Sequence, residues 1–232
     1  MALKFNANLS AGLQNAEYDE IADEVAASTP AGGLVLDWGA GEGQITHRVA
    51  ERGITVRSCE FDPTVDGVEE RSFALYPELK RLDSSDPVAL PFEDETFDVV
   101  LSCGVLEHVE HPLGSLAEVR RVLKPGGRLL VYKLPNRYSV LEFVAKVGGL
   151  SYHGMRIHDT LWGIRSTAWA LDAAGFDVQW IRRANMLPLS VDHPALNKRT
   201  QSLYVLNKKL TTIPGLGVLA TNIEAAAVKP AA

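Results

Sequence analysis

Three glycines at alternate positions follow a short apolar run in residues 34–44, which read LVLDWGAGEGQ. Gly39, Gly41 and Gly43 let the backbone turn sharply and approach a bound molecule closely, because no Cβ stands in the way. Asp37 adds a carboxylate at the end of the apolar run. Open α/β sheets bind ligands at such a turn, between a buried parallel strand and a crossover helix. The stretch therefore predicts a ligand-binding turn.

A second carboxylate, Glu60, ends the next strand-like run, residues 54–60. It comes about 20 residues after the glycine turn, the separation at which a βαβ unit places an acid on the hydroxyls of a bound ribose. For an isolated acid at a strand end, the simpler interpretation is a charge that faces solvent. Because the glycine turn precedes it, we interpret Glu60 as a ribose acceptor.

The glycine spacing argues against a nicotinamide dinucleotide as the ligand. Such cofactors use Gly-x-Gly-x-x-Gly, which lets the start of the helix receive a pyrophosphate. Here the glycines fall at 39, 41 and 43, and position 44 is Gln. The turn and Glu60 instead suit a cofactor that carries a ribose but no phosphate.

Alternating strands and helices are expected to position these residues. Strand-like runs cover residues 34–37, 54–60, 78–82, 97–102, 128–133, 176–182 and 219–228, and helical patterns cover 17–26, 42–52, 65–75, 113–123, 166–174 and 195–210. This alternation predicts a doubly wound α/β fold with a parallel sheet and right-handed crossovers. Residues 1–30 form an N-terminal helical segment. Residues 134–165 lack a regular period, which is typical of a substrate lid or loop.

Length and composition fit a single domain over residues 1–232, since 46% of the 232 residues are hydrophobic and can form a full core. The formal charge of −6 disfavours nucleic acid and membrane surfaces as partners. Cys59 and Cys103 are too few for a disulfide framework and fit reduced thiols in a cytoplasmic protein. No apolar run approaches the roughly 20 residues of a membrane-spanning helix.

Five motifs in order and spacing resemble the class I S-adenosylmethionine-dependent methyltransferases. They are VLDWGAGEG at 35–43, the strand ending in Glu60, LPF at 90–92 with FDVV at 97–100, VLEHV at 105–109 and LKPGG at 123–127. The similarity is greatest to the small-molecule branch called methyltransferase type 11, which includes ubiquinone-pathway O-methyltransferases. It covers residues 35–133 and continues weakly to the end. The resemblance implies a Rossmann-like seven-stranded sheet, mostly parallel, with an antiparallel last strand.

The resemblance also implies S-adenosyl-L-methionine as the cofactor. The glycine turn with Asp37 would hold its methionine half, Glu60 would accept both ribose hydroxyls, and Phe61 would pack on the adenine. Asp86 matches the acid that accepts the adenine amino group, and Asp83 is the alternative if the loop is read in a shifted register.

Two further positions follow from the same resemblance. Ser102 and Cys103 would line the sulfonium through backbone groups. Trp38 departs from the family, in which a smaller apolar residue is usual at this position. We interpret Trp38 as a packing residue, although it also has the size to reshape the pocket floor.

A histidine is the expected general base. Methyl transfer is an in-line displacement at an activated carbon, so the protein mainly aligns the acceptor and removes its proton. The unperturbed pKa of histidine suits that task near neutrality. His108 follows the fourth strand and is the first candidate, ahead of His111, His153 and His158. The alternative role for His108 is packing that shapes the loop.

The segment before residue 165 also contains candidate residues for a metal site and for contact with an aromatic acceptor. His153 and His158 are five residues apart, which does not place both on one helix face, and hard cations prefer oxygen ligands. We therefore expect no metal. Tyr138, Tyr152 and Trp162 either stack on an aromatic or sugar acceptor or pack within the lid.

The expected function is methylation of a small-molecule acceptor, at oxygen rather than at nitrogen or carbon. Family members that methylate bases or amides carry an Asn/Asp-Pro-Pro-aromatic run where this chain has SCGV at 102–105. The alternatives are a macromolecule-directed methyltransferase and a non-catalytic S-adenosylmethionine-binding protein. A cytoplasmic monomer or homodimer is expected.

Overall fold

The structure is a computed structural model that describes residues 4–5, 12–41, 43–60, 81–83, 86–147, 160–187, 191–192 and 198–231. Its strands are β1 (Lys4–Phe5), β2 (Leu34–Trp38), β3 (Thr55–Glu60), β4 (Arg81–Asp83), β5 (Phe97–Cys103), β6 (Leu123–Pro135), β7 (Asp177–Ala184), β8 (Val191–Asp192) and β9 (Asn222–Val228). Its helices are α1 (Gly12–Ser28), α2 (Gln44–Glu51), α4 (Pro112–Val122), α5 (Val140–Val147), α6 (Ile164–Ala173), α8 (Thr200–Thr211) and the 3-10 helix η2 (Leu216–Leu219). None of the helices in these ranges is long and apolar enough to cross a membrane.

The large sheet has the strand order β4-β3-β2-β5-β6-β9-β7. β9 runs antiparallel to both of its neighbours, β6 and β7, and the other neighbouring pairs are parallel. The predicted α/β fold, mostly parallel with an antiparallel last strand, is therefore confirmed. β1 and β8 form a separate two-stranded antiparallel sheet.

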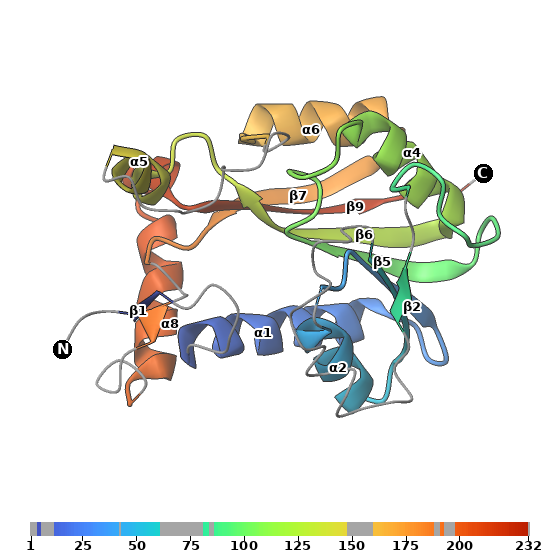
Figure 1. The fold of residues 1–232 in the computed structure, drawn as a ribbon, viewed down its shortest axis with the longest axis horizontal. Coiled ribbons are helices and arrows are strands. Elements are labelled where there is room, and N and C mark those ends of the chain that lie inside the picture. Colours follow the sequence, from blue (N-terminus) through green and yellow to red (C-terminus); the bar gives the residue numbers. More distant parts are fainter. Residues whose placement is uncertain are drawn as a thin grey trace.

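Helices cover both faces of the large sheet (Figure 1). On one face, Leu116 and Val119 of α4 and Leu171 of α6 are buried in a core with the strands. On the other face, Ile21 and Val25 of α1 pack in a second core with α2 and the strands. The two cores explain the apolar residues at helical spacing in both sets of helices.

The structure differs from the predicted elements in several places. β9 begins at Asn222, not at residue 219, because the 3-10 helix η2 occupies Leu216–Leu219, and the short strands β1 and β8 were not predicted. β6 begins at Leu123, not at residue 128, because Leu123 pairs with Phe97 and the ladder then shifts register across the Pro-Gly-Gly segment. Residues 140–147 form α5 within the segment predicted to lack regular structure. Apolar residues do recur there at helical spacing, but they are exposed, namely Val140, Phe143, Val144 and Val147. The predicted helix at 65–75, Phe61, Tyr152, His153 and His158 lie outside the described residues.

Candidate functional site

The carboxyl ends of parallel strands bring the predicted cofactor residues to one edge of the sheet. β2 ends at Trp38, β3 at Glu60 and β5 at Cys103. Trp38 is in register with Cys59 on one side and with Ser102 on the other. The glycine turn, the two acids and the end of β5 therefore lie along three neighbouring strands.

The glycine turn folds back onto the end of β3. The backbone N–H groups of Gly39 and Ala40 both donate to the carbonyl oxygen of Cys59, at 2.9 and 3.0 Å. Gly39, Gly41 and Gly43 have φ angles of 77°, 54° and 78°, in the left-handed region that favours glycine. Gly43 is also the N-cap residue of α2. The local backbone thus explains why these three positions are glycine.

The space around the turn differs between the glycines. A Cβ on Gly39 would collide with the side chain of Val105, which follows β5. Among the described residues, no atom lies within 4 Å of a Cβ built on Gly41. Gly39 is therefore needed for packing, whereas the backbone at Gly41 can be approached without a collision with any described residue.

Glu60 joins the end of β3 to the glycine turn. The backbone N–H of Gly41 donates to Glu60 Oε2 at 2.6 Å, and Glu60 is only 7% exposed. A carboxylate has about four lone-pair sites. The bond to the turn is therefore compatible with the predicted acceptance of ribose hydroxyls, and it fixes the carboxylate beside the backbone that the ligand would contact.

Asp37 is a buried acid at the end of β2. Thr46 Oγ1, from the first turn of α2, donates to Asp37 Oδ2 at 2.6 Å. Burial raises the pKa of the Asp37 carboxyl to about 6; the hydrogen bond from Thr46 opposes this rise and the charge of Glu60 adds to it. Two neighbouring carboxyl groups favour a ligand group of positive charge.

The end of β5 supplies a buried hydroxyl and a thiol. Ser102 is fully buried, and within the described part of the chain its Oγ has no hydrogen-bond partner. Burial raises the pKa of the half-buried Cys103 thiol well above its ordinary value, although the charge of Lys133 opposes the rise. Burial also raises the pKa of Cys59 to about 12. Because the thiolate is the nucleophilic form, neither cysteine suits covalent catalysis.

His108 lies in the turn that follows β5. Its backbone N–H donates to the carbonyl oxygen of Val105 at 2.9 Å. Its side chain is 33% exposed, and Nε2 lies 3.8 Å from Oε1 of Glu107, which is buried. The imidazole is thus partly open to solvent and lies beside a buried carboxylate.

The residues predicted to bind adenine are only partly placed. Asp86 is exposed, and its Oδ1 accepts the backbone N–H of Val88 at 2.8 Å. The alternative acid, Asp83, ends β4 in backbone register with Glu60. Phe61 lies outside the described residues. The choice between Asp83 and Asp86 therefore stays a prediction.

The groups at this edge fit S-adenosyl-L-methionine. The carboxylates of Asp37, Glu60 and Glu107 suit its cationic sulfonium and ammonium groups, and the bare backbone at Gly41 allows close approach. Positions 37–43 contain no Lys or Arg, the usual partners of a pyrophosphate. In the described ranges, no group of His, Cys, Asp or Glu is arranged to hold a metal ion.

Known proteins resemble the part of the chain that contains this site. Residues 36–131 match the family described as Methyltransferase domain. A demethylmenaquinone methyltransferase of Tropheryma whipplei is 36% identical to this chain over 129 residues, which cover 54% of this chain and 52% of that protein. A ubiquinone/menaquinone biosynthesis C-methyltransferase of Ruegeria sp. is 39% identical over 112 residues, 45% of each chain. The chain thus spans about half the length of these relatives.

A solved structure supports the fold over most of the chain. An S-adenosylmethionine-dependent methyltransferase from Thermotoga maritima superposes with a TM-score of 0.59 over 91% of this chain and 89% of that one, at 18% identity. This likeness shows the fold of the chain. The individual site residues named above remain predictions.

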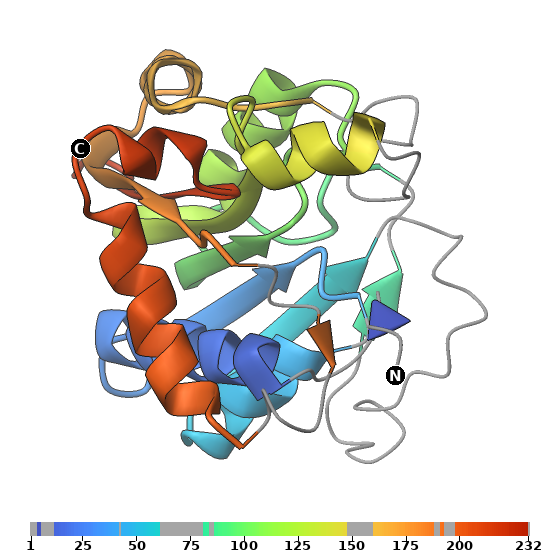
Figure 2. The ribbon, with the colours of Figure 1, turned by 90° about the vertical axis from the view of Figure 1, so that its left-hand side faces the viewer.

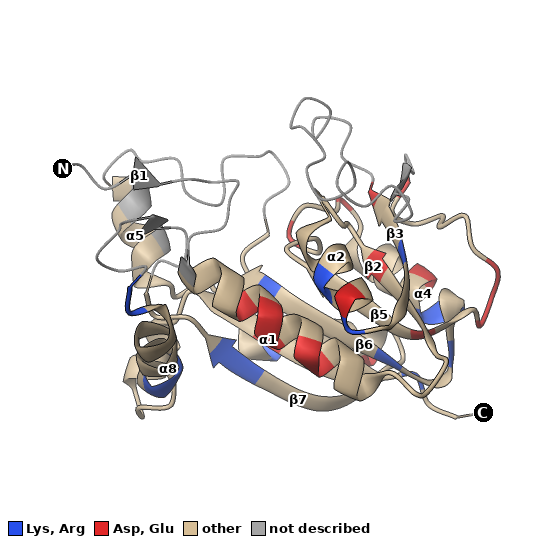
Figure 3. Ribbon diagram, turned by 90° about the horizontal axis from the view of Figure 1, so that it is seen from below, with Lys and Arg blue, Asp and Glu red and all other residues tan. Residues whose placement is uncertain are grey.

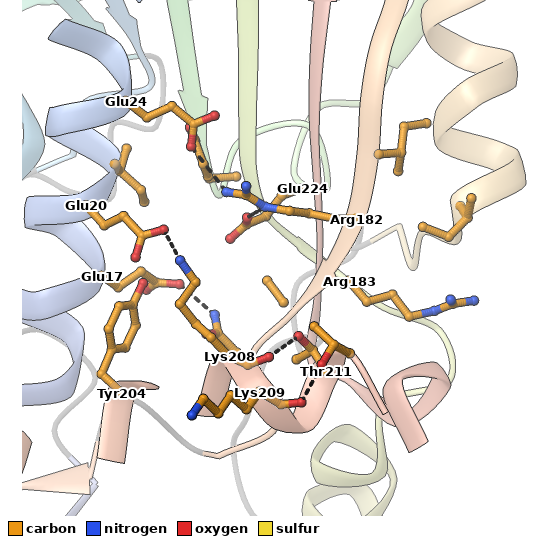
Figure 4. Close-up of a pocket in the computed structure, with 17 residues that line it drawn as sticks. Glu17, Glu20, Glu24, Arg182, Arg183, Tyr204, Lys208, Lys209, Thr211 and Glu224 are labelled. Carbon is orange, nitrogen blue, oxygen red and sulfur yellow. Dashed lines mark hydrogen bonds and ion pairs between the residues drawn. The ribbon is translucent and has the colours of Figure 1, made fainter. Parts of the chain in front are cut away.

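A cavity of about 490 Å³ lies apart from the glycine turn, between α1, α8 and β7 (Figure 4). Arg182 forms ion pairs with Glu224 at 2.7 Å and with Glu24 at 3.2 Å, and Lys208 pairs with Glu20. Burial raises the pKa of the Glu224 carboxyl to about 7, although Arg182 opposes the rise. Figure 2 shows α8 beside α1, and Figure 3 colours the acidic residues along α1 and the basic residues on β7 and α8. We interpret this cluster as packing of α1 against the edge of the sheet.

Two contacts near the site are not part of the prediction from sequence. The first is the bond from Thr46 to Asp37, for which a hydroxyl in the first turn after the glycines is a detectable signal. Lys133 and Glu17 were not predicted to meet, yet Lys133 Nζ lies 3.0 Å from Glu17 Oε2. Their separation in the sequence left no local pattern that joins them.

Proposed function

We propose that this protein is a methyltransferase, which transfers the methyl group of S-adenosyl-L-methionine to a small molecule with a hydroxylated ring, such as a quinol. The single observation that carries the donor half is the nearly buried Glu60 carboxylate, which accepts the Gly41 N–H in the glycine turn. The ring acceptor is supported by the names of the two relatives, which refer to menaquinone and ubiquinone.

The chain's own residues have three tasks in this proposal. Bound S-adenosyl-L-methionine would supply a methyl carbon that its positive sulfur already activates. Glu60 and the glycine turn fix the donor, and the buried end of β5 aligns the acceptor opposite the sulfur. His108 takes the hydroxyl proton, and Glu107 stabilises the imidazolium that results.

Transfer to oxygen is the prediction from the sequence, and transfer to a ring carbon is the second candidate. The Ruegeria relative is described as a C-methyltransferase, which favours carbon. A hydroxylated ring offers both atoms to the same site, because ionisation of the hydroxyl enriches the oxygen and the neighbouring ring carbons in electrons. A macromolecular acceptor and a non-catalytic binder are the remaining alternatives.

The experiment supplies the purified enzyme with labelled S-adenosyl-L-methionine and a panel of reduced naphthoquinols, benzoquinols and catechols. Mass spectrometry detects a methylated ring, and NMR of the product separates an O-methyl from a C-methyl group. We expect at least one ring acceptor to be methylated at a rate that depends on enzyme concentration. Absence of transfer to every ring, with label in added protein or RNA, would contradict the proposal.

A further inference from the structure

A β-bulge near the carboxyl end of β6 changes the direction of Lys133. Val131 pairs with Ala225 and Leu134 with Ile223, so Tyr132 and Lys133 together oppose the single residue between those partners on β9. Lys133 has a φ angle of 61°, in the left-handed region that costs energy for a residue with a Cβ. Bulges often re-aim a side chain beside an active site.

The bulge places two consecutive side chains on the same face of the sheet. Tyr132 packs in the core on the α1 side, whereas Val131 and Leu134 pack in the core on the α4 side. Regular alternation would send residue 133 to the α4 side with residue 131. Instead, the Lys133 ammonium lies 3.0 Å from Glu17 Oε2 and 4.2 Å from the centre of the Tyr18 ring, both on α1.

The ammonium is held by a buried carboxylate, and its side chain is not fully enclosed. Its neighbour Glu17 is 2% exposed and also accepts a hydrogen bond from Asn185 Nδ2 at 2.6 Å. The side chain of Lys133 is 17% exposed. Burial lowers the pKa of Lys133, but the charge of Glu17 outweighs it and the pKa rises well above its ordinary value. Lys133 is therefore a cation on a side chain that is partly open to solvent.

Lys133 lies at a distance from the predicted cofactor residues that leaves room for an acceptor between them. β3, β2, β5 and β6 are neighbours in that order, so carboxylates lie at the ends of the first two strands and the ammonium lies near the end of the fourth. Neighbouring strands are about 4.8 Å apart. Lys133 is thus about 10 Å across the sheet from β2. Cys103, on the strand between them, has a pKa that the charge of Asp37 raises and the charge of Lys133 lowers.

From this placement we infer that Lys133 binds the hydroxyl oxygen of the acceptor ring in its ionised form, and that Glu17 and Tyr18 position the ammonium. This inference rests on the proposed function and assigns a residue to its acceptor side. A purely structural ion pair would not require the ammonium to leave the regular strand path at a strained φ. Strain of this kind concentrates at functional sites.

The role of Lys133 in the transfer is electrostatic. A cation at hydrogen-bond distance from the ring oxygen favours its ionised form. The oxygen, or a ring carbon beside it, then supplies the electron pair of the new bond to the methyl carbon, and the sulfur–carbon bond breaks with its pair on sulfur. The acceptor proton passes to His108 or to water. The same ammonium therefore serves transfer to oxygen and transfer to carbon.

Lys133→Met and Lys124→Met form the matched pair that tests this inference. Both remove a lysine of β6 that is paired with a carboxylate, but Lys124 lies near the opposite end of the strand, 2.8 Å from Asp98. Lys133→Gly is the second variant, because glycine adopts a φ of 61° without strain and keeps the bulge. Calorimetry with S-adenosyl-L-homocysteine is expected to give Kd values within about twofold of wild type for all three.

The expected result is a fall in kcat/KM for the ring acceptor of about tenfold to a hundredfold in both Lys133 variants and none in Lys124→Met. The rising limb of the pH–rate profile should move to higher pH, because the acceptor hydroxyl then ionises without the ammonium. Equal kcat/KM and an unchanged pH profile in Lys133→Met and Lys133→Gly would overturn the inference.

A measurement without turnover separates this inference from the proposed function. 4-Nitrophenol, whose neutral and ionised forms absorb at different wavelengths, is titrated with pH in the presence of each variant saturated with S-adenosyl-L-homocysteine. We expect its ionisation to shift to lower pH with wild type and Lys124→Met but not with Lys133→Met. If no quinol is methylated while this difference persists, the proposed function fails and the inference stands. Identical titrations, or no binding to wild type, would overturn the inference.

Discussion

At the scale of single residues, Glu60 carries the donor half of the site. Its carboxylate is nearly buried, and it accepts the Gly41 N–H at 2.6 Å. The same group thus shapes the turn and is the proposed acceptor of the ribose hydroxyls. Charge-assisted hydrogen bonds of this type are stronger than neutral ones.

Glu60→Gln is predicted to weaken the binding of S-adenosyl-L-homocysteine by about tenfold to a hundredfold, because hydrogen bonds to a charged group contribute about 1.5–3 kcal/mol. Calorimetry measures the Kd directly. Glu51→Gln, an exposed acid on α2, is the matched control and should leave the Kd unchanged. An unaltered Kd in Glu60→Gln would show that the ribose acceptor has been wrongly assigned.

The sequence predicts which residues belong to the site better than it predicts which residues they contact. Asp37, Glu60 and the glycines stand at strand ends that the local pattern marks, so the sequence alone brings them to one edge. The bulge that redirects Lys133 depends on pairing with β9, whose residues come far later in the chain. Alternation along β6 by itself predicts the wrong face for this lysine, so only the folded structure reveals its partner Glu17.

At the scale of elements, the glycine turn depends on backbone conformations that favour glycine. Gly41 and Gly53 both have positive φ angles, 54° and 75°, and among the described residues no atom lies within 4 Å of a Cβ added at either position. Gly41 lies in the turn after β2, whereas Gly53 lies just after α2. The two glycines therefore separate backbone strain from loss of the ligand's space.

Gly41→Ala and Gly53→Ala are predicted to cost a similar free energy of unfolding, roughly 1 kcal/mol each, because both force a residue with a Cβ into the left-handed region. Only Gly41→Ala should also weaken the binding of S-adenosyl-L-homocysteine, by tenfold or more, because its methyl group occupies the open space beside Glu60. Chemical denaturation and calorimetry give the two quantities. Equal Kd values for both variants would place the cofactor elsewhere.

Elements with a clear period were predicted well, and elements defined by their partners were not. The strands and helices around the site follow runs of apolar residues, and the antiparallel last strand follows from the family resemblance. β6 extends back to Leu123 because of its pairing with Phe97, which the Pro-Gly-Gly segment conceals in the sequence. α5 was overlooked because it begins in a stretch of mixed polar and aromatic residues, and its apolar side chains are exposed.

At the scale of the whole molecule, negative and positive side chains lie at different strands along the edge of the sheet that holds the candidate site. Carboxylates stand at the ends of β2 and β3, where a cationic donor is expected, and the Lys133 ammonium stands near the end of β6. α1 links this edge to the rest of the fold, because it contributes Glu17 to Lys133 and Glu24 to Arg182 on β7. In the proposed function, the carboxylates mark the donor side and the Lys133 ammonium marks the acceptor side.

The most direct test of methyl transfer to a small molecule follows the label in a mixture of natural acceptors. The enzyme is incubated with tritiated-methyl S-adenosyl-L-methionine and a cell extract, and the products are separated into small-molecule, protein and nucleic-acid fractions. Glu60→Gln at the same concentration is the control for enzyme-dependent transfer. We predict enzyme-dependent label in the small-molecule fraction. Label confined to protein or nucleic acid, or no transfer despite tight binding of S-adenosyl-L-methionine, would contradict the account.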